Sequence, residues 1–126
     1  MKNILTALVC FVTISAFSQT EIKVDDAKNH IGETVKICTK IFGGKFFEKD
    51  SLTLLNAGGF YPDAPLTIVI RGKLRDELNM SEEYYKGAEV CIMGKLEMYM
   101  EKPEIVIFKK EQIEEQSKDH VDQEPK

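Results

Sequence analysis

The sequence predicts a mainly β domain, and three observations lead to this expectation. Apolar and polar residues alternate over long stretches, which is typical of half-buried strands. Five strand-like segments occur, separated by clusters of glycine, asparagine, proline and charged residues that favour turns. Helical periodicity is confined to two short segments, one before the first strand and one between the third and the fourth.

The first half of the chain is expected to hold one short helix and two strands. Residues 25–31 carry apolar side chains at helical spacing, and Gly32 follows as a left-handed stop. Residues 34–42 alternate and predict the first strand, which the following glycine pair is expected to end in a turn region over 43–50. Residues 51–55 then predict the second strand.

The second half is expected to supply a short helix and three more strands. The β-branched run 66–71 predicts a third strand covered on both faces for much of its length. A short helix is expected within residues 74–85. Residues 88–99 alternate around Gly94, which suggests a bulge or sharp bend, and 103–108 form the fifth strand. This order predicts a five-stranded Greek-key OB barrel, with a short N-terminal helix and a short helix between strands 3 and 4.

Three segments differ in composition. Residues 1–18 have a charged start, a short apolar run and small residues near Ser18, as in a secretory signal peptide. A membrane anchor is the alternative, but the run is shorter than the roughly 20 residues that span a bilayer. Residues 19–108 would form the barrel, and residues 109–126 a charged tail that is a frayed helix or disordered. The sequence thus predicts export, to the periplasm or the extracellular space.

Charge balance and residue spacing limit the functions that the sequence supports. Lys and Arg number 17 against 21 Asp and Glu, so a general electrostatic attraction to phosphate is absent, although a local basic groove is compatible with this balance. His30 and His120 lie far apart in the sequence, and no Ser or Cys has a recognisable nucleophile setting. No Cys or His pair has metal-ligand spacing. We therefore expect no enzyme activity, no cofactor and no metal, with a hydrolase as the lowest-ranked alternative.

Four stretches, 31–38, 54–63, 85–96 and 99–107, resemble bacterial exported OB-fold domains, in particular the accessory OB modules beside the nuclease domains of secreted nucleases. The resemblance covers about residues 22–113 and implies a non-enzymatic module that binds single-stranded nucleic acid or oligonucleotides. It places the ligand on strands 2 and 3 and on the loops that join strands 1–2 and 4–5. The positions that correspond here are Lys45, Phe46, Phe47, Lys49, Asn56, Phe60, Tyr61, Arg71, Tyr99 and Lys102.

Aromatic rings interleaved with cations suit sequence-tolerant binding of a single strand. Acidic residues also occur among these positions, however, and would weaken a phosphate track; they are Glu48, Asp50, Glu101 and Glu104. One member of the Phe46–Phe47 pair is expected to plug the end of the barrel, which leaves the other for a ligand. OB folds also bind proteins and sugars, so an envelope protein or glycan partner on the same face is the alternative.

Removal of the signal peptide would leave two cysteines. Cys38 and Cys91 both fall on the polar side of their strands, and the first and fourth strands of an OB barrel are antiparallel neighbours. An oxidising compartment would favour a bond between thiols that face each other. We therefore predict a Cys38–Cys91 disulfide.

Overall fold

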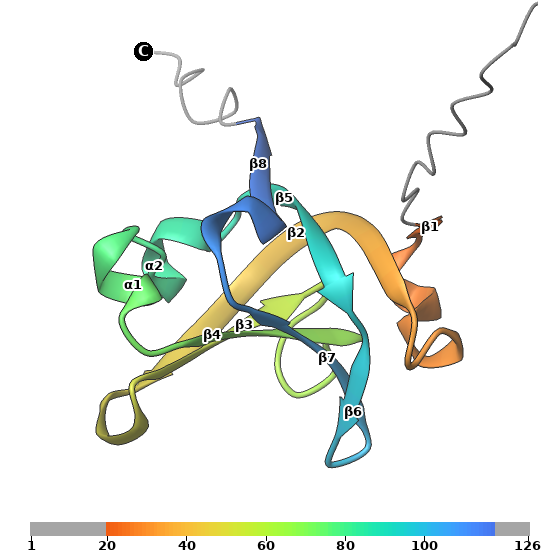
Figure 1. Cartoon of the computed structure of the whole chain (residues 1–126), viewed down its shortest axis with the longest axis horizontal. Helices are drawn as coiled ribbons and strands as arrows, with labels where there is room; N and C mark the ends of the chain where they lie inside the picture. Colours follow the sequence, from red (N-terminus) through yellow and green to blue (C-terminus); the bar gives the residue numbers. More distant parts are fainter. Residues whose placement is uncertain (1–19, 118–126) are drawn as a thin grey trace, which may run out of the picture.

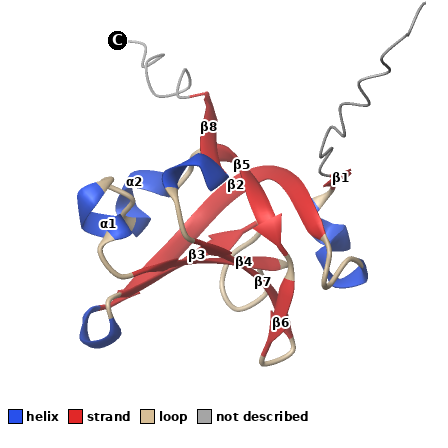
Figure 2. Ribbon diagram, in the orientation of Figure 1, coloured by secondary structure: helices blue, strands red, loops and turns tan. Residues whose placement is uncertain are grey.

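A computed structural model describes residues 20–117 of the protein, so residues 1–19, which include the predicted signal peptide, and residues 118–126 lie outside the described residues. The described chain forms one strongly curved eight-stranded sheet with short helical turns at its ends (Figures 1 and 2). The strands are β1 (Thr20–Ile22), β2 (Thr34–Phe47), β3 (Leu52–Ala57), β4 (Leu66–Arg71), β5 (Glu89–Lys95), β6 (Glu97–Tyr99), β7 (Lys102–Ile107) and β8 (Ile113–Ser117). The helices are α1 (Leu74–Glu77) and α2 (Glu82–Tyr85), and 3-10 turns span Val24–Asn29, Glu48–Asp50 and Lys110–Gln112.

The prediction of a mainly β, OB-like fold is confirmed. The sheet order is β6-β7-β4-β3-β2-β5-β8, with β1 added in parallel to β2. Among the five main strands β2, β3, β4, β5 and β7, the pair β2 and β5 has the antiparallel relation expected for the first and fourth strands. Strand β2 is also antiparallel to β3, and β4 is parallel to β7. A closed barrel of five strands is not confirmed, because β1, β6 and β8 are additional and no ladder joins β5 to β7 within residues 20–117.

The long strand β2 corrects the expected turn at the glycine pair. Its first half pairs with β5 and its second half with β3, and the register shifts between Ile41 and Gly43. Gly44 crosses β3 so closely that a Cβ atom there would lie 2.3 Å from the carbonyl oxygen of Leu54. The glycines therefore bend the strand from one partner to the other instead of ending it. The actual turn is the short Glu48–Asp50 segment.

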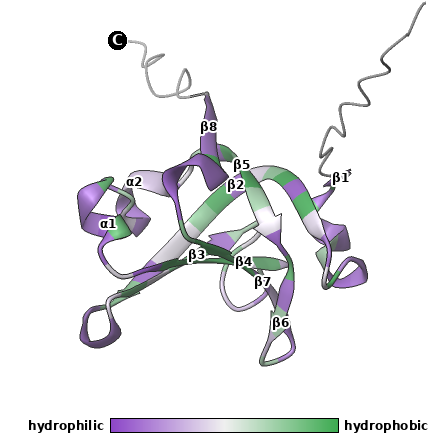
Figure 3. Cartoon of the chain, viewed as in Figure 1, coloured by the Kyte–Doolittle hydropathy of each residue, from purple (hydrophilic) through white to green (hydrophobic). Residues whose placement is uncertain are grey.

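The core lies on the concave side of the sheet, where every second side chain of the central strands is buried. In β3 the pattern alternates cleanly: Thr53, Leu55 and Ala57 are buried while their neighbours are half-exposed. Figure 3 shows the apolar colouring concentrated along β4, β7 and parts of β2 and β5, with polar residues in the connecting turns. In β4, Val69 on the outer side is also largely covered, which agrees in part with the expected two-sided burial.

The predicted disulfide is confirmed. Cys38 and Cys91 are direct partners in the antiparallel β2–β5 ladder, and their sulfur atoms are bonded. The polar-side register of both strands explains the position of the bond, because directly opposite residues of a ladder share one face of the sheet.

The open edge between β5 and β7 is bridged by one side chain. The amide nitrogen of Gln112 donates to the carbonyl oxygens of Met93 in β5 and Val106 in β7, both at 3.1 Å. Its amide oxygen accepts hydrogen bonds from the backbone nitrogens of Phe108 and Lys109. We call this junction between β5 and β7 the seam, and define it by Gln112 together with the contact between Gly94 and Ile105.

Gly94 serves this seam and does not form the predicted bulge. It stays in regular register with β2, opposite Val35. A Cβ atom at Gly94 would lie 2.6 Å from Cγ2 of Ile105, so only glycine permits the close approach of β5 to β7.

Other elements differ from expectation mainly in their ends. The helix predicted over 25–31 is a 3-10 turn at Val24–Asn29, and the helix expected within 74–85 is the separate pair α1 and α2. The predicted strand 88–99 divides into β5 and β6. The expected tail from residue 109 instead adds β8 to the edge of β5. Within the described part of the chain, no helix has the length and apolar character needed to span a membrane.

Candidate ligand-binding cleft

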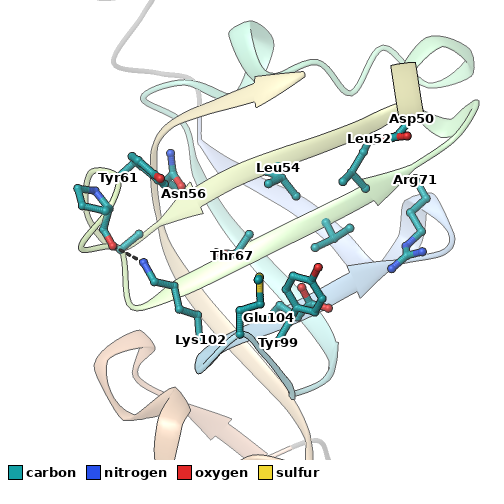
Figure 4. A pocket seen from close by; sticks show the side chains of 14 residues that line it. Asp50, Leu52, Leu54, Asn56, Tyr61, Thr67, Arg71, Tyr99, Lys102 and Glu104 are labelled. Atoms are coloured by element: carbon teal, nitrogen blue, oxygen red, sulfur yellow. Dashed lines mark hydrogen bonds between the residues drawn. The ribbon is translucent and has the colours of Figure 1, made fainter. Parts of the chain in front are cut away.

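A cleft lies on the outer face of β3, β4 and β7, opposite the core. The strand registers align its side chains in rows across the sheet: Asn56 with Thr67 and Glu104, and Leu54 with Val69. With the β3–β4 loop and the β6–β7 hairpin as walls, these rows enclose a cleft of about 550 Å³ (Figure 4). The floor therefore has an apolar row beside a polar row, both fixed by backbone pairing.

Each end of the cleft carries a cation. Figure 4 shows Lys102 beside Tyr61 at one end and Arg71 beside Asp50 at the other. The ammonium group of Lys102 donates a hydrogen bond to the carbonyl oxygen of Pro62 and lies 5.8 Å from the centre of the Tyr61 ring. That contact joins the β3–β4 loop to β7, and a cation over a ring at this distance is favourable.

The β6–β7 hairpin presents a second tyrosine to the cleft. Tyr99 and Lys102 are paired across a two-residue turn in which Met100 and Glu101 have φ angles of 50° and 67°. Two successive positive φ angles are the geometry of a type I′ turn, which asparagine and glycine adopt more easily. The turn holds Tyr99 and Met100 against the cleft while 61% and 78% of their surfaces remain exposed.

Glu104 places a carboxylate at the β7 end of the polar row. Partial burial and the neighbouring carboxylate of Glu97, its cross-strand partner in β6, raise the pKa of Glu104, while Arg71 acts in the opposite direction. The cleft thus holds a carboxylate between its two ends, of which one carries Lys102 and the other carries Arg71 beside Asp50.

Half of the predicted ligand residues line the cleft, and they come from β3, β4, β7 and the two connections. These residues are Asn56, Tyr61, Arg71, Tyr99 and Lys102. Lys45 and Phe47 lie on the same outer face, opposite Leu54 and Leu52, but outside the cleft lining. The ammonium group of Lys45 lies 5.0 Å from the centre of the Phe47 ring.

The remaining predicted residues point elsewhere. Phe46 faces the core side, opposite Thr53, and the guanidinium of Arg75 stacks over its ring at 3.8 Å. Phe60 packs edge-on against Phe42, with ring centres 4.9 Å apart. Lys49 is exposed in the turn after β2. Phe46 is thus half-buried beneath the Arg75 guanidinium, and the expected plugging of a barrel end by one member of the phenylalanine pair stays a prediction.

The apolar floor was missed by the sequence reasoning. Leu52, Leu54 and Val69 were assigned to strands without a role at the ligand, and Glu104 was considered only as a charge that opposes phosphate. The signal was present in the alternation of β3: its outward residues include Asn56, so the residues two and four positions earlier share that face.

A second hollow and the possible metal ligands were also considered as candidate sites. A second hollow of about 540 Å³ lies between α2 and β8, and it contains none of the predicted ligand residues. Within residues 20–117, no group of three or more His, Cys, Asp or Glu side chains could hold a metal ion.

The comparisons with known proteins bear on the fold alone. No protein-family model matches the sequence, and no curated protein matches it. A putative aspartyl-tRNA synthetase from Leishmania major is similar in structure over 82% of this chain, with a TM-score of 0.52 and 11% identity. The S. pombe Stn1-ten1 complex is similar over 70% of this chain, with a TM-score of 0.48 and 18% identity. The chain spans 22% of the first of these proteins and 61% of the second.

Proposed function

We propose that the chain is an exported, non-enzymatic module whose cleft binds single-stranded nucleic acid or oligonucleotides. The observation that carries this proposal is the arrangement of two exposed tyrosines, Tyr61 and Tyr99, as walls above an apolar floor, with a cation at each end. Bases offer flat apolar faces that stack on such rings, and the phosphates between them are attracted to lysine and arginine.

The charges of the cleft define the expected mode of binding. Lys102 and Arg71 contact phosphates at the two ends, while bases cover Leu54 and Val69 between them. Few phosphates are neutralised in this arrangement, so affinity is modest and falls with salt on a shallow slope. This mode accommodates the acidic balance of the whole chain, because attraction is needed only at two points.

A protein partner is the second candidate, and it is favoured by one observation. Met100 is exposed beside Tyr99 and lines the cleft, which gives the tip of the hairpin an apolar surface continuous with the cleft floor. Methionine and tyrosine are enriched at protein interfaces. Such a partner would be bound with little dependence on salt, unlike an oligonucleotide.

Fluorescence anisotropy with labelled single strands of about 12 nucleotides tests the proposal at low and moderate salt. Tyr61→Ala and Tyr99→Ala should each weaken binding by about 1–3 kcal/mol, or roughly 5- to 150-fold, because each removes a stacking surface. Phe108→Ala is the matched control, since this exposed aromatic residue lies outside the cleft. Absence of binding at low salt would overturn the proposal, and cleavage of the labelled strand would overturn its non-enzymatic part.

Export is tested separately, by expression of the full chain in a bacterium followed by mass spectrometry of the cell fractions. The expected product begins at Gln19 and is found outside the cytoplasm. An intact chain retained in the cytoplasm or in the membrane would contradict this part of the proposal.

A further inference from the structure

The polar row of the cleft contains hydrogen-bonding groups that the protein itself leaves available. Asn56, Thr67 and Glu104 lie side by side across β3, β4 and β7. Among residues 20–117, none of their side chains has a hydrogen-bond partner, and no lysine or arginine nitrogen lies within 4.0 Å of the Glu104 carboxylate. A bound ligand can therefore use these groups without displacing an existing contact.

Glu104 restricts what this ligand presents to the middle of the cleft. Its ionised carboxylate accepts hydrogen bonds and donates none, and it repels phosphate. Phosphates are therefore confined to the two ends, near Lys102 and Arg71. The group over Glu104 must be a base that offers a hydrogen-bond donor.

Pyrimidines differ at the position that matters. Cytosine carries an N4 amino group, which donates to carboxylates, whereas uracil and thymine carry an O4 carbonyl there. Their remaining donor, N3–H, lies between the O2 and O4 carbonyls, and both carbonyl oxygens would face the carboxylate unfavourably. We infer that the cleft selects cytosine over uracil and thymine through a hydrogen bond from the N4 amino group to the carboxylate of Glu104. This inference rests on the proposed function and adds a base preference to it.

The backbone supports such selection. Glu104 lies in a strand that pairs on both sides, with Thr67 of β4 and with Glu97 of β6, so its Cα position is fixed by two ladders. The Tyr61 and Tyr99 rings at the walls provide stacking that does not distinguish bases, and the discrimination comes from the polar row alone.

The test compares labelled oligo-dC and oligo-dU of equal length at about pH 8, where carboxyl groups are ionised and oligo-dC is single-stranded. A good base contact contributes about 1–3 kcal/mol of discrimination, so oligo-dC is expected to bind at least about fivefold more tightly than oligo-dU. Oligo-dT, which adds only the methyl group, should behave as oligo-dU does.

Two variants of equal charge separate the contact from general electrostatics. Glu104→Gln should bring the dC/dU affinity ratio close to one, because an amide both donates and accepts. Glu97→Gln is the control, since it removes the same charge from the paired position outside the cleft lining and should keep the ratio. Glu97→Gln is expected to raise the affinity for both oligonucleotides slightly, because it reduces repulsion of phosphate. Glu104→Gln reduces the same repulsion but also loses the cytosine contact, so it should weaken the binding of oligo-dC.

The outcomes distinguish this inference from the function on which it rests. Equal affinity for oligo-dC and oligo-dU in the unmodified chain, or an unchanged affinity ratio in Glu104→Gln, overturns the base preference. The proposed binding of single-stranded nucleic acid would still stand. Failure of all strands to bind at low salt overturns the proposed function itself.

Discussion

The two edges of β5 are held in different ways. On one edge, β5 forms a continuous ladder with β2 from Glu89 to Lys95, and the Cys38–Cys91 disulfide joins the two strands covalently. On the other edge, β8 pairs with the first part of β5, from Glu89 to Ile92, and beyond this ladder β5 meets β7 only through the seam, where Gln112 bridges two carbonyl groups. The disulfide therefore contributes to the stability of the fold without contacting the cleft. The seam also affects the geometry of the cleft, because β7 carries part of the cleft lining.

Removal of the Cys38–Cys91 disulfide should have the largest effect on the free energy of unfolding. Replacement of both cysteines, Cys38→Ser with Cys91→Ser, removes a bond that closes a loop with a sequence separation of 53. In the chain-entropy model this lowers the free energy of unfolding by about 4 kcal/mol. Urea denaturation measures the loss, and the unmodified chain under reducing conditions should show the same shift.

The affinity of the same double variant for oligonucleotides tests whether the two edges of β5 act independently. Its affinity for single strands should match that of the unmodified chain under conditions where both are folded, because the disulfide lies on β2 and β5 away from the cleft. A large change in affinity would mean that the two edges of β5 are not independent. Two titratable thiols in the denatured, unreduced chain would contradict the disulfide itself.

Removal of the hydrogen bonds at the seam should cause the second largest loss in the free energy of unfolding. Gln112→Ala removes four hydrogen bonds and leaves the carbonyl oxygens of Met93 and Val106 without their partner. Leaving half-buried groups unsatisfied costs about 2–3 kcal/mol in total, with water replacing part of the loss. Denaturation measures this change, and Glu111→Ala provides a neighbouring exposed control.

Unlike the cysteine variant, Gln112→Ala should also weaken the binding of oligonucleotides. It frees one edge of β7, the β-strand that holds Lys102 and Glu104. Unchanged affinity in a variant that has lost stability would show that the β4–β7 ladder alone positions these residues.

Overfilling the seam should have a smaller effect. Gly94→Ala places a Cβ atom 2.6 Å from Cγ2 of Ile105, so the two strands must separate or the isoleucine must move. Such overpacking costs about 1–2 kcal/mol. Ile105→Leu removes the branched methyl group, and in a double-mutant cycle it should recover part of the loss measured by denaturation. Strict additivity of the two changes would contradict the contact.

The contrast between the two edges also explains how far the sequence could be used to predict this fold. The β2–β5 ladder was predictable because residues 34–40 and 89–93 alternate and each carries one cysteine in the same register. The seam was not, because its main residue is a glutamine in a highly charged segment. Edge strands β1 and β8 are short and mostly polar, so nothing in their composition distinguishes them from a tail.

The cleft shows a similar division. Tyr61, Tyr99 and Lys102 were predictable because aromatic and basic residues in connecting segments are conspicuous. Leu54 and Val69 were not, since an outward apolar residue in a strand has the same appearance in a sequence as a core residue. Only the register across β3 and β4 identifies the face on which they lie.

The smallest expected effect concerns Glu104, on the outer face of the strand that borders the seam. Its pKa is raised in the folded chain by partial burial and by Glu97, so folding favours the protonated form. The stabilising contribution is present at low pH and is lost as the pH rises through the folded-state pKa. Glu104→Gln keeps the neutral form at every pH and should raise the melting temperature slightly near neutrality.

This gain should shrink as the pH falls from about 7 towards 4, because Glu104 of the unmodified chain then becomes protonated as well. Thermal melts of both chains across this range measure it, and Glu97→Gln should give a chain with a weaker pH dependence, since it removes one cause of the shift. A gain that is independent of pH would show that the carboxylate is not destabilising in the cleft. A loss of stability in Glu104→Gln would instead show that Glu104 helps to hold β7 in position, as Gln112 does at the seam, and is not a group left unpaired for a ligand.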